Sequence, residues 1–436
     1  MQSTGKIKKI GVYTASALVI ANMIGTGVFT SLGFQVESIQ SGFVLIMLWL
    51  VGGIVALSGA LSYSELGAAL PRSGGEYNFL SKIYHPLIGF LSGWVSITVG
   101  FAAPTALAAM ALASYSTSVF PKLNPILLAT IVVFFLTLAH SKDIKTGSKL
   151  QNIFTSIKLI LILFFIIAGC FISNPQPLKF FPLHGDWKLL TSSSFAVSLI
   201  YVSYAYSGWN AATYITGEIK EPHKNIPRAL IMGTLVVVIL YVFLNFIFLY
   251  TSPISELSGQ VEIGYISAVN IFGNIGGTIM SLAISLLLVS TISAMIWVGP
   301  RVTQIMGEDH KILRFLAYKS PRGVPIYAMW LQTAIALTLI YTSTFKQVLL
   351  YAGFTLNLFT FLTVAGVFIF RIKQPKINRP YKTWGYPITP LLFLLLSLWI
   401  LTYLLIYQPK ESLAGLITVF AGVIFYLIDK FIVSNK

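Results

Sequence analysis

One lysine lies deep inside an apolar stretch, where a charged group requires a specific function or partner. Lys158 comes nine residues after Lys149, at the start of the apolar run 150–173. A helix rises 1.5 Å per residue, so the ammonium group should lie about 13 Å into a membrane, near its midplane. Lysine at that depth costs roughly 2.5–3.5 kcal/mol on the insertion scale. The alternative is snorkelling, in which the aliphatic stem of the lysine extends so that its ammonium group reaches the membrane interface. The depth favours an ammonium group that binds main-chain carbonyls and hydroxyls, and that could also carry a proton.

Two glycines, Gly25 and Gly27, interrupt the first apolar run where a membrane helix should be continuous. Each costs roughly 1 kcal/mol relative to alanine in a helix. A break here frees N–H and C=O groups that hydrocarbon cannot satisfy, so it requires a cavity or a ligand. The N–H groups that open the second half-helix are suited to a carboxylate. A packing notch of small residues is the alternative. The segment reads Ala21-Asn22-Met23-Ile24-Gly25-Thr26-Gly27-Val28-Phe29.

The composition is that of a membrane protein with many spans. Of the 436 residues, 56% are hydrophobic and 10% are charged, against about 25% charged in soluble domains. The one cysteine, Cys170, permits no internal disulfide, and the five histidines have no ligand spacing, so we expect no metal and no cofactor. The apolar runs carry no paired carboxylates and no nucleophile–base pair, so we do not expect an enzyme.

Twelve apolar runs are long enough for membrane helices, each of which needs about 20 residues. An even number places both termini on one side. The segments on that side hold 23 Lys and Arg residues and the other segments hold 5, which predicts cytoplasmic termini in a multi-pass protein of the cell (plasma or inner) membrane. This bias explains the net charge of +16 without nucleic acid. The runs are 10–36, 41–69, 85–118, 123–140, 150–173, 189–217, 227–250, 268–305, 325–342, 346–371, 387–407 and 411–431.

The first and sixth runs are interrupted at corresponding depths. Gly25 and Gly27 divide the first run, and Ser207-Gly208 divide the sixth. Interrupted spans at matching positions of two halves are the best sequence indicator of a transporter binding site. The predicted fold is an all-α membrane protein with twelve transmembrane helices. A five-helix repeat and its inverted copy cover 1–175 and 185–372, and two accessory helices cover 385–432.

A loop after the second run combines acidic, basic and turn residues. Pro71 and the pair Gly74-Gly75 punctuate a tight turn between Glu65 and Glu76. The segment predicts either a cytoplasmic gate with Glu–Arg ion pairs or an ordinary chain reversal.

Seven motifs are specific in combination and cover most of the first ten spans: Met23–Phe29, Tyr63–Gly67, Pro71–Tyr77, Tyr204–Asn210, Glu221–Pro227, Ser293–Met295 and Gly299–Val302. With these motifs the chain resembles the amino acid–polyamine–organocation (APC) transporters. Within them it is most similar to the L-type amino acid transporter (LAT) branch and its bacterial relatives. The resemblance implies a leucine-transporter-like fold in which helices 1 and 6 are discontinuous.

The resemblance also implies roles for the interrupted segments. Main-chain N–H groups around Thr26 bind the substrate carboxylate, carbonyls of both interruptions bind its ammonium group, and Tyr204 occupies the place of an aromatic gate. The substrate-binding residues implied are Met23, Ile24, Gly25, Thr26, Gly27, Tyr204, Ser207 and Trp209. Members of this fold that use sodium hold the broken first span to the eighth with that ion. Lys158 is implied to replace it, reaching carbonyls near Gly25 and hydroxyls of the eighth run, with Ser290 and Ser293 as the expected partners.

The predicted substrate is a neutral L-amino acid, because no acidic residue lies at mid-membrane in runs one, three, six, eight or ten. A cationic amino acid or polyamine, which would need such a residue, is the alternative. Sodium-independent exchange and proton coupling both fit, with alternating access. A sensor or channel on the same scaffold is a further alternative. Eukaryotic light chains of this branch carry a cysteine between spans three and four that bonds a partner glycoprotein. The segment 117–124 has none, so we expect no disulfide-linked heavy chain.

Overall fold

The computed structural model describes residues 9–142 and 147–434, with side chains for all of these except 147–152. The described chain is helical, with one isolated parallel bridge between Ile10 and Ile219. In order, the elements are α1 (Val12–Met23), α2 (Gly27–Gln35), α3 (Gly42–Ala69), α4 (Glu76–Ile83), α5 (Pro86–Val95), the π-helical η1 (Ser96–Gly100), α6 (Ala102–Val119), α7 (Pro125–Lys142), α8 (Gly147–Gly169), α9 (Asp186–Leu189), α10 (Ser193–Ala205), the 3-10 helix η2 (Ala211–Glu218), α11 (Pro222–Thr251), α12 (Ile254–Leu257), α13 (Ile263–Asp309), the 3-10 helix η3 (Lys311–Ala317), α14 (Ile326–Thr342), α15 (Phe345–Lys373), α16 (Ile388–Tyr407) and α17 (Pro409–Ser434).

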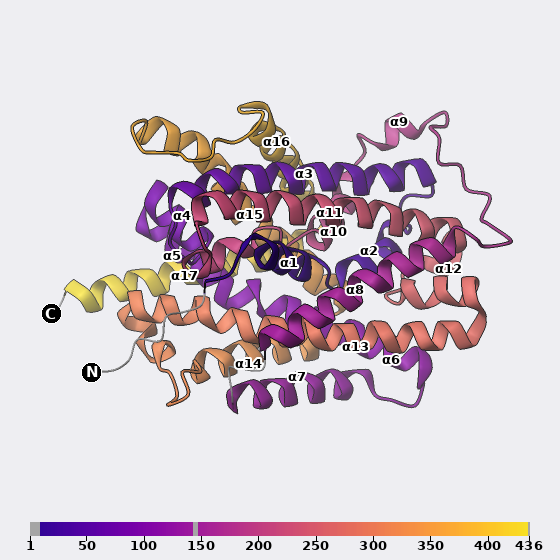
Figure 1. The fold of residues 1–436 in the computed structure, drawn as a ribbon, viewed down its shortest axis with the longest axis horizontal. Coiled ribbons are helices and arrows are strands. Elements are labelled where there is room, and N and C mark those ends of the chain that lie inside the picture. The colour runs from indigo at the N-terminus through magenta and orange to yellow at the C-terminus, as the bar shows by residue number, and fades with distance from the viewer. Residues whose placement is uncertain (1–8, 143–146, 435–436) are drawn as a thin grey trace.

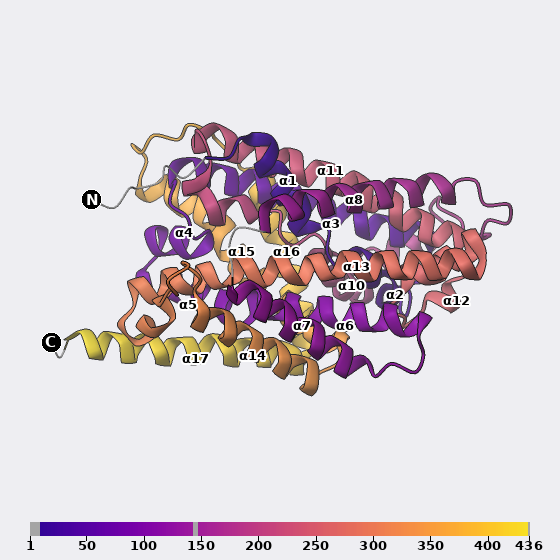
Figure 2. The ribbon, with the colours of Figure 1, turned by 60° about the horizontal axis from the view of Figure 1, so that its bottom comes forward.

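The long helices lie mostly along one axis. The first and last described residues lie toward the same end of the bundle, which we call the terminal end, while α9 and α12 lie toward the opposite end (Figure 1). α13 is kinked at Gly273, which has φ +73°, and the part that follows the kink runs along nearly the whole length of the molecule (Figure 2).

Nine helices or helix pairs of the described chain are long and apolar enough to cross a membrane. Three shorter apolar helices lie in the fifth, sixth and ninth predicted runs; they are Ile153–Gly169, Ser193–Ala205 and Ile326–Thr342. Each of the twelve predicted runs therefore contains an apolar helix, and the number that crosses the membrane stays a prediction. Lys149, the marker for the start of the fifth run, has a side chain outside the described ones.

The predicted interruption of the first run is confirmed. α1 ends at Met23 and α2 begins at Gly27. Between them, Ile24 has φ −76° and ψ 83°, and the Gly25 N–H donates to the Met23 carbonyl at 2.8 Å. This is an inverse γ-turn, so the C-terminus of α1 and the N-terminus of α2 meet inside the first predicted run.

The sixth run is interrupted as well. α10 ends at Ala205, and the 3-10 helix η2 begins at Ala211. Gly208 has φ +97°, and a Cβ atom there would lie 2.9 Å from both atoms of the Asn22 backbone carbonyl. Both the positive φ and the close approach require glycine at this position. The second interruption therefore packs directly against the end of α1.

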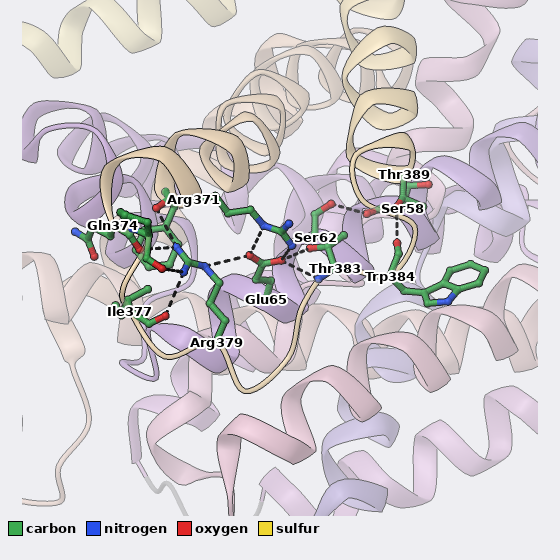
Figure 3. A network of polar contacts seen from close by, with 12 residues as sticks. Ser58, Ser62, Glu65, Arg371, Gln374, Ile377, Arg379, Thr383, Trp384 and Thr389 are labelled. Atoms are coloured by element: carbon green, nitrogen blue, oxygen red, sulfur yellow. Dashed lines mark hydrogen bonds and ion pairs between the residues drawn. The ribbon is translucent and has the colours of Figure 1, made fainter.

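A buried carboxylate fastens the loop between α15 and α16 to the end of α3 (Figure 3). Glu65 is fully buried. Arg371 donates to it through Nε at 2.8 Å and Nη2 at 2.6 Å, and Thr383 donates through its N–H at 2.7 Å and its hydroxyl at 2.8 Å. Arg379 Nε lies 3.5 Å from Oε1. Glu65 thus forms ion pairs, but with arginines from the far end of the sequence and not with an arginine of its own segment. The cytoplasmic gate stays a prediction.

We expect Glu65→Ala to be strongly destabilising. Removing one partner of a buried ion pair costs about 3–5 kcal/mol, because the remaining charges lose their compensation. The measurement is the thermal unfolding midpoint of the purified protein in detergent.

The matched control for Glu65→Ala is Glu308→Ala, because the Glu308 carboxylate lies 3.6 Å from Lys319 with both side chains about half exposed. Exposed pairs contribute about 0–1 kcal/mol. Equal shifts of the thermal midpoint in the two variants would contradict a stabilising role for the buried Glu65 ion pair.

Candidate functional site

A cavity of about 290 Å³ lies where the two interruptions meet. Its wall includes Ile10, residues of α1 from Thr14 to Met23, the turn up to Gly27, and residues 203–211, with further residues from α3, α6, α13 and α15. Only Gly27 of α2 contributes, so the cavity extends from the interruptions toward the terminal end. Its volume is at the lower end of the roughly 300–1,000 Å³ of small-molecule sites, which suits a small ligand.

Packed aromatic rings separate the cavity from the opposite end. Phe34 of α2 stacks on Tyr201 at 5.6 Å and on Phe345 at 5.9 Å between ring centroids. Beside them, Lys346 Nζ lies 2.5 Å from the Glu37 carboxylate. The cavity is therefore reached from one end of the bundle, the terminal end.

The start of α2 offers main-chain donors to this cavity. Thr26 is the N-cap of α2, and its side chain makes no capping hydrogen bond. The N–H groups of Thr26, Gly27 and Val28 have no acceptor among the residues that the structure describes. The Gly25 N–H differs, since it donates to Met23. Free N–H groups at a helix N-terminus form an anion site, so of the three implied residues Thr26 and Gly27 are free to bind a carboxylate.

The carbonyls implied to hold an ammonium group are unequally available. The Met23 carbonyl already accepts from the Gly25 N–H at 2.8 Å and the Tyr241 hydroxyl at 2.6 Å, which uses both of its lone pairs. The Tyr204 carbonyl accepts from the Ser207 N–H at 2.9 Å and shares the Tyr206 N–H with the Val202 carbonyl. The Ser207 carbonyl accepts no backbone bond within the described chain. Acceptors for a ligand therefore lie at the second interruption, with Ser207 and, beside it, Tyr204.

Lys158 is buried, with 2% of its surface exposed. Its ammonium group donates to the Ile24 carbonyl at 3.0 Å and to the Thr291 hydroxyl at 2.8 Å. A continuous helix would pair the Ile24 carbonyl with the Val28 N–H, so the lysine satisfies an acceptor that the break has freed. It also joins α8 to the break and to α13.

The hydroxyls expected to bind Lys158 are not its partners. Ser293 lies 2.7 Å from His140 Nε2, and the buried Ser290 hydroxyl has no partner within the described chain. Successive helical residues are separated by about 100° around the axis, and α13 presents Thr291 to α8. The prediction that the eighth run supplies a hydroxyl is correct, and the choice of Ser290 and Ser293 is wrong.

Aromatic side chains complete the wall beside the second interruption. Trp209 is buried and lines the cavity, with its ring 4.7 Å from that of Tyr63 and 6.4 Å from that of Phe393. Tyr204 also lines the cavity, and its side chain lies beside that of Thr26. Both residues thus lie where sequence reasoning expected them, next to the main-chain groups of the two breaks.

Besides Thr291, sequence reasoning missed Tyr241 and Glu76. Tyr241 of α11 binds the turn through Met23, and no local pattern distinguishes it from the other tyrosines of apolar runs. Glu76 lines the cavity although it lies in a predicted loop. The glycine pair before it, which permits a sharp approach of the loop, was the available signal.

Comparison with known proteins identifies relatives over most of the chain. A family model described as amino acid permease matches residues 10–428. Large neutral amino acids transporter small subunit 2 of Mus musculus is 29% identical, over 97% of this chain and 81% of the relative. The b(0,+)-type amino acid transporter 1 of Mus musculus is 25% identical, over 98% and 89%. Asc-type amino acid transporter 1 of Mus musculus is 26% identical, over 96% and 81%.

The two glycines of the first interruption differ in the space around them, which gives a matched pair of variants. A Cβ atom at Gly27 would lie 2.4 Å from Ala205 Cα, whereas one at Gly25 would meet Thr291 Cγ2 at 3.6 Å, an ordinary contact. We expect Gly27→Ala to lower the free energy of unfolding by about 1–3 kcal/mol, as overpacking does, by forcing α2 away from α10. Gly25→Ala should change it by less than about 1 kcal/mol.

Thermal midpoints in detergent and amino acid uptake by proteoliposomes, measured for both variants, check this expectation. A thermal midpoint that falls more in Gly25→Ala than in Gly27→Ala would contradict this expectation.

Proposed function

Because the chain belongs to the amino acid permease family, we propose that it is a secondary active transporter of neutral L-amino acids. It works by alternating access without sodium, as an exchanger or with proton coupling. The observation that supports this most is the meeting of two interrupted helices at one cavity. Such a pair offers main-chain donors and acceptors to a zwitterion at mid-membrane depth.

In this proposal each interruption binds one of the two charged groups of the amino acid. The N–H groups of Thr26 and Gly27 bind the carboxylate, and the carbonyls of Tyr204 and Ser207 bind the ammonium group. Trp209 forms part of the wall for the side chain. Met23 and Ile24 act indirectly, because their carbonyls already accept bonds from Tyr241 and Lys158.

Lys158 takes the place of a cation that would hold the broken helix to α13. Its bonds to Ile24 and Thr291 support this role. A permanent ammonium group removes the need for sodium at this position. A lysine that gives up its proton would release the same two groups, which is how proton coupling would act here.

The arrangement in the membrane follows the charge bias of the sequence. The terminal end faces the cytoplasm, so the cavity opens inward in this structure. Twelve spans form repeats over 1–175 and 185–372, with accessory helices in 385–432, in the plasma or inner membrane. The mirrored interruptions in α1–α2 and α10–η2 support the inverted repeat.

The small cavity and the name of one relative, which specifies large neutral amino acids, support a neutral substrate. That same relative is named a small subunit. The segment 117–124 has no cysteine, and the one cysteine of the chain, Cys170, lies beyond α8. We propose that no partner is attached by a disulfide at that segment. Cationic substrates, and a sensor or channel on this scaffold, are the alternatives.

Counterflow distinguishes these functions. Proteoliposomes loaded with an unlabelled neutral amino acid and diluted into sodium-free buffer should accumulate the labelled amino acid, because exchange needs no ion. Empty liposomes and unloaded proteoliposomes are the controls. Ion currents without saturable uptake would indicate a channel, and an absolute need for sodium would contradict the role of Lys158.

Variants of the lysine and its partner test the cation role. Hydrogen bonds to charged groups contribute about 1.5–3 kcal/mol each, and about 1.4 kcal/mol is tenfold. We therefore expect Thr291→Val, which removes one of the two bonds and keeps the shape of threonine, to lower the initial uptake rate about tenfold or more. Lys158→Ala removes both bonds and should lower the rate about a hundredfold or more.

Ser290→Ala is the control for that series, because it removes the neighbouring hydroxyl that has no partner in the described chain. Its rate should stay within about twofold of the parent, as for substitutions outside key contacts. Near-normal uptake by Lys158→Ala, or a larger loss in Ser290→Ala than in Thr291→Val, would refute the role.

A further inference from the structure

A carboxylate from outside the apolar runs lies on the wall of the cavity. Glu76 is the first residue of α4 and is 5% exposed. The preceding glycines have positive φ, +116° at Gly74 and +53° at Gly75. A Cβ atom at Gly75 would lie 2.6 Å from the ring of Tyr214, so glycine allows this loop to close against η2. The closure carries Glu76 to the cavity.

Three neutral groups hold the Glu76 carboxylate. Tyr63 of α3 donates to it at 3.0 Å, Tyr214 of η2 donates at 2.7 Å, and the amide of Asn210 donates to Oε1 as well. Three donors suit an ionised carboxylate, which can only accept. No Lys, Arg or His nitrogen of the described residues lies within ion-pair distance of it.

The other charged side chains on the cavity wall compensate each other. Arg301 Nη1 lies 3.6 Å from the Glu218 carboxylate, and its guanidinium group lies 3.8 Å from the centre of the Trp297 ring. Glu76, Glu218 and Arg301 are the charged residues that line the cavity within the described chain. Among the charged residues that line the cavity in the described chain, Glu76 is therefore the one without a partner of opposite charge. The Lys158 ammonium group does not line the cavity and binds Ile24 and Thr291 instead. Charges in such an interior are poorly screened.

We propose that Glu76 is a specificity-determining residue that selects ligands by charge. Its carboxylate attracts ammonium groups, so the cavity admits cationic side chains besides neutral ones, and it repels the second carboxylate of acidic amino acids. This inference rests on the proposed function and widens its substrate class from neutral amino acids to neutral and cationic ones, with acidic ones excluded. A purely apolar side-chain region would not make this distinction.

A structural role for Glu76 makes a different prediction. The same three bonds fasten η2 to α3 and α4, so any change at Glu76 lowers stability in either case. Only the charge of the carboxylate alters the ratio between cationic and acidic ligands. The decisive readout is therefore a selectivity ratio, which loss of folded protein does not change.

The experiment measures inhibition of labelled alanine uptake in proteoliposomes by lysine, glutamine and glutamate, side chains that differ in charge and little in length. In the parent protein we expect glutamate to inhibit at least about tenfold more weakly than glutamine. Glu76→Gln should raise the half-inhibitory concentration of lysine relative to that of glutamate about tenfold. Glu76→Asp should keep the parent ratio. Tyr214→Phe, which removes one bond and keeps the charge, should lower the thermal midpoint without moving the ratio.

Two results overturn the inference. One is a parent protein in which glutamate inhibits as well as glutamine, a measurement that does not depend on any variant folding. The other is an unchanged ratio in folded Glu76→Gln. A parent protein that takes up no amino acid overturns the proposed function instead, and is recognised because no inhibition can then be measured.

Discussion

The backbone carbonyl of Ile24 is the acceptor on which the site depends. A continuous helix would satisfy it from within, and in the middle of a bilayer an unsatisfied carbonyl costs several kcal/mol. Here a buried ammonium group from α8 satisfies it, and the Tyr241 hydroxyl does the same for Met23. The break persists because two side chains from other helices replace the bonds that the backbone gave up.

This compensation is one-sided. The carbonyls on the α1 side of the break are paired, while the N–H groups that open α2 have no acceptor in the described part of the chain. Protein side chains thus bind the carbonyls at the end of α1. The N–H groups at the start of α2, which line the cavity at Thr26 and Gly27, are left without an acceptor in the described chain. In the proposed function a carboxylate binds at the first interruption, and the ammonium group binds the carbonyls of the second. The division of roles follows from which bonds are already made.

The sequence allowed us to predict where glycine or a charge is unfavourable within a membrane helix. It did not allow us to predict which residues of different helices contact each other. The breaks near Gly25 and Gly208 were predictable because glycine in a membrane helix is costly wherever the helix packs. Lys158 was predictable because a lone charge at that depth must have partners. Its partner Thr291 was not, since adjacent residues of α13 differ only in their direction around the axis. Glu65 and Glu76 were placed in one loop, but their partners come from α15, η2 and the loop 374–387, hundreds of residues away in some cases. Such contacts depend on the packing of whole helices, which no local pattern encodes.

The contacts also divide the bundle into parts that hold firmly and parts that separate easily. Backbone bonds of 2.9 Å join Ile10 to Glu218 and to Lys220, so α1 and η2 are tied to each other at the terminal end. α3 and the loop after α15 are tied by the buried Glu65. At the opposite end the Lys346–Glu37 pair is partly exposed, and such pairs contribute little. The other contacts at that end are the stacked rings of Phe34, Tyr201 and Phe345, which can separate without leaving a buried charge unpaired. Under the proposed alternating access, these contacts favour a movement of α1 and η2 as one unit against α3 and α15, while the aromatic contacts of α2 and α10 open.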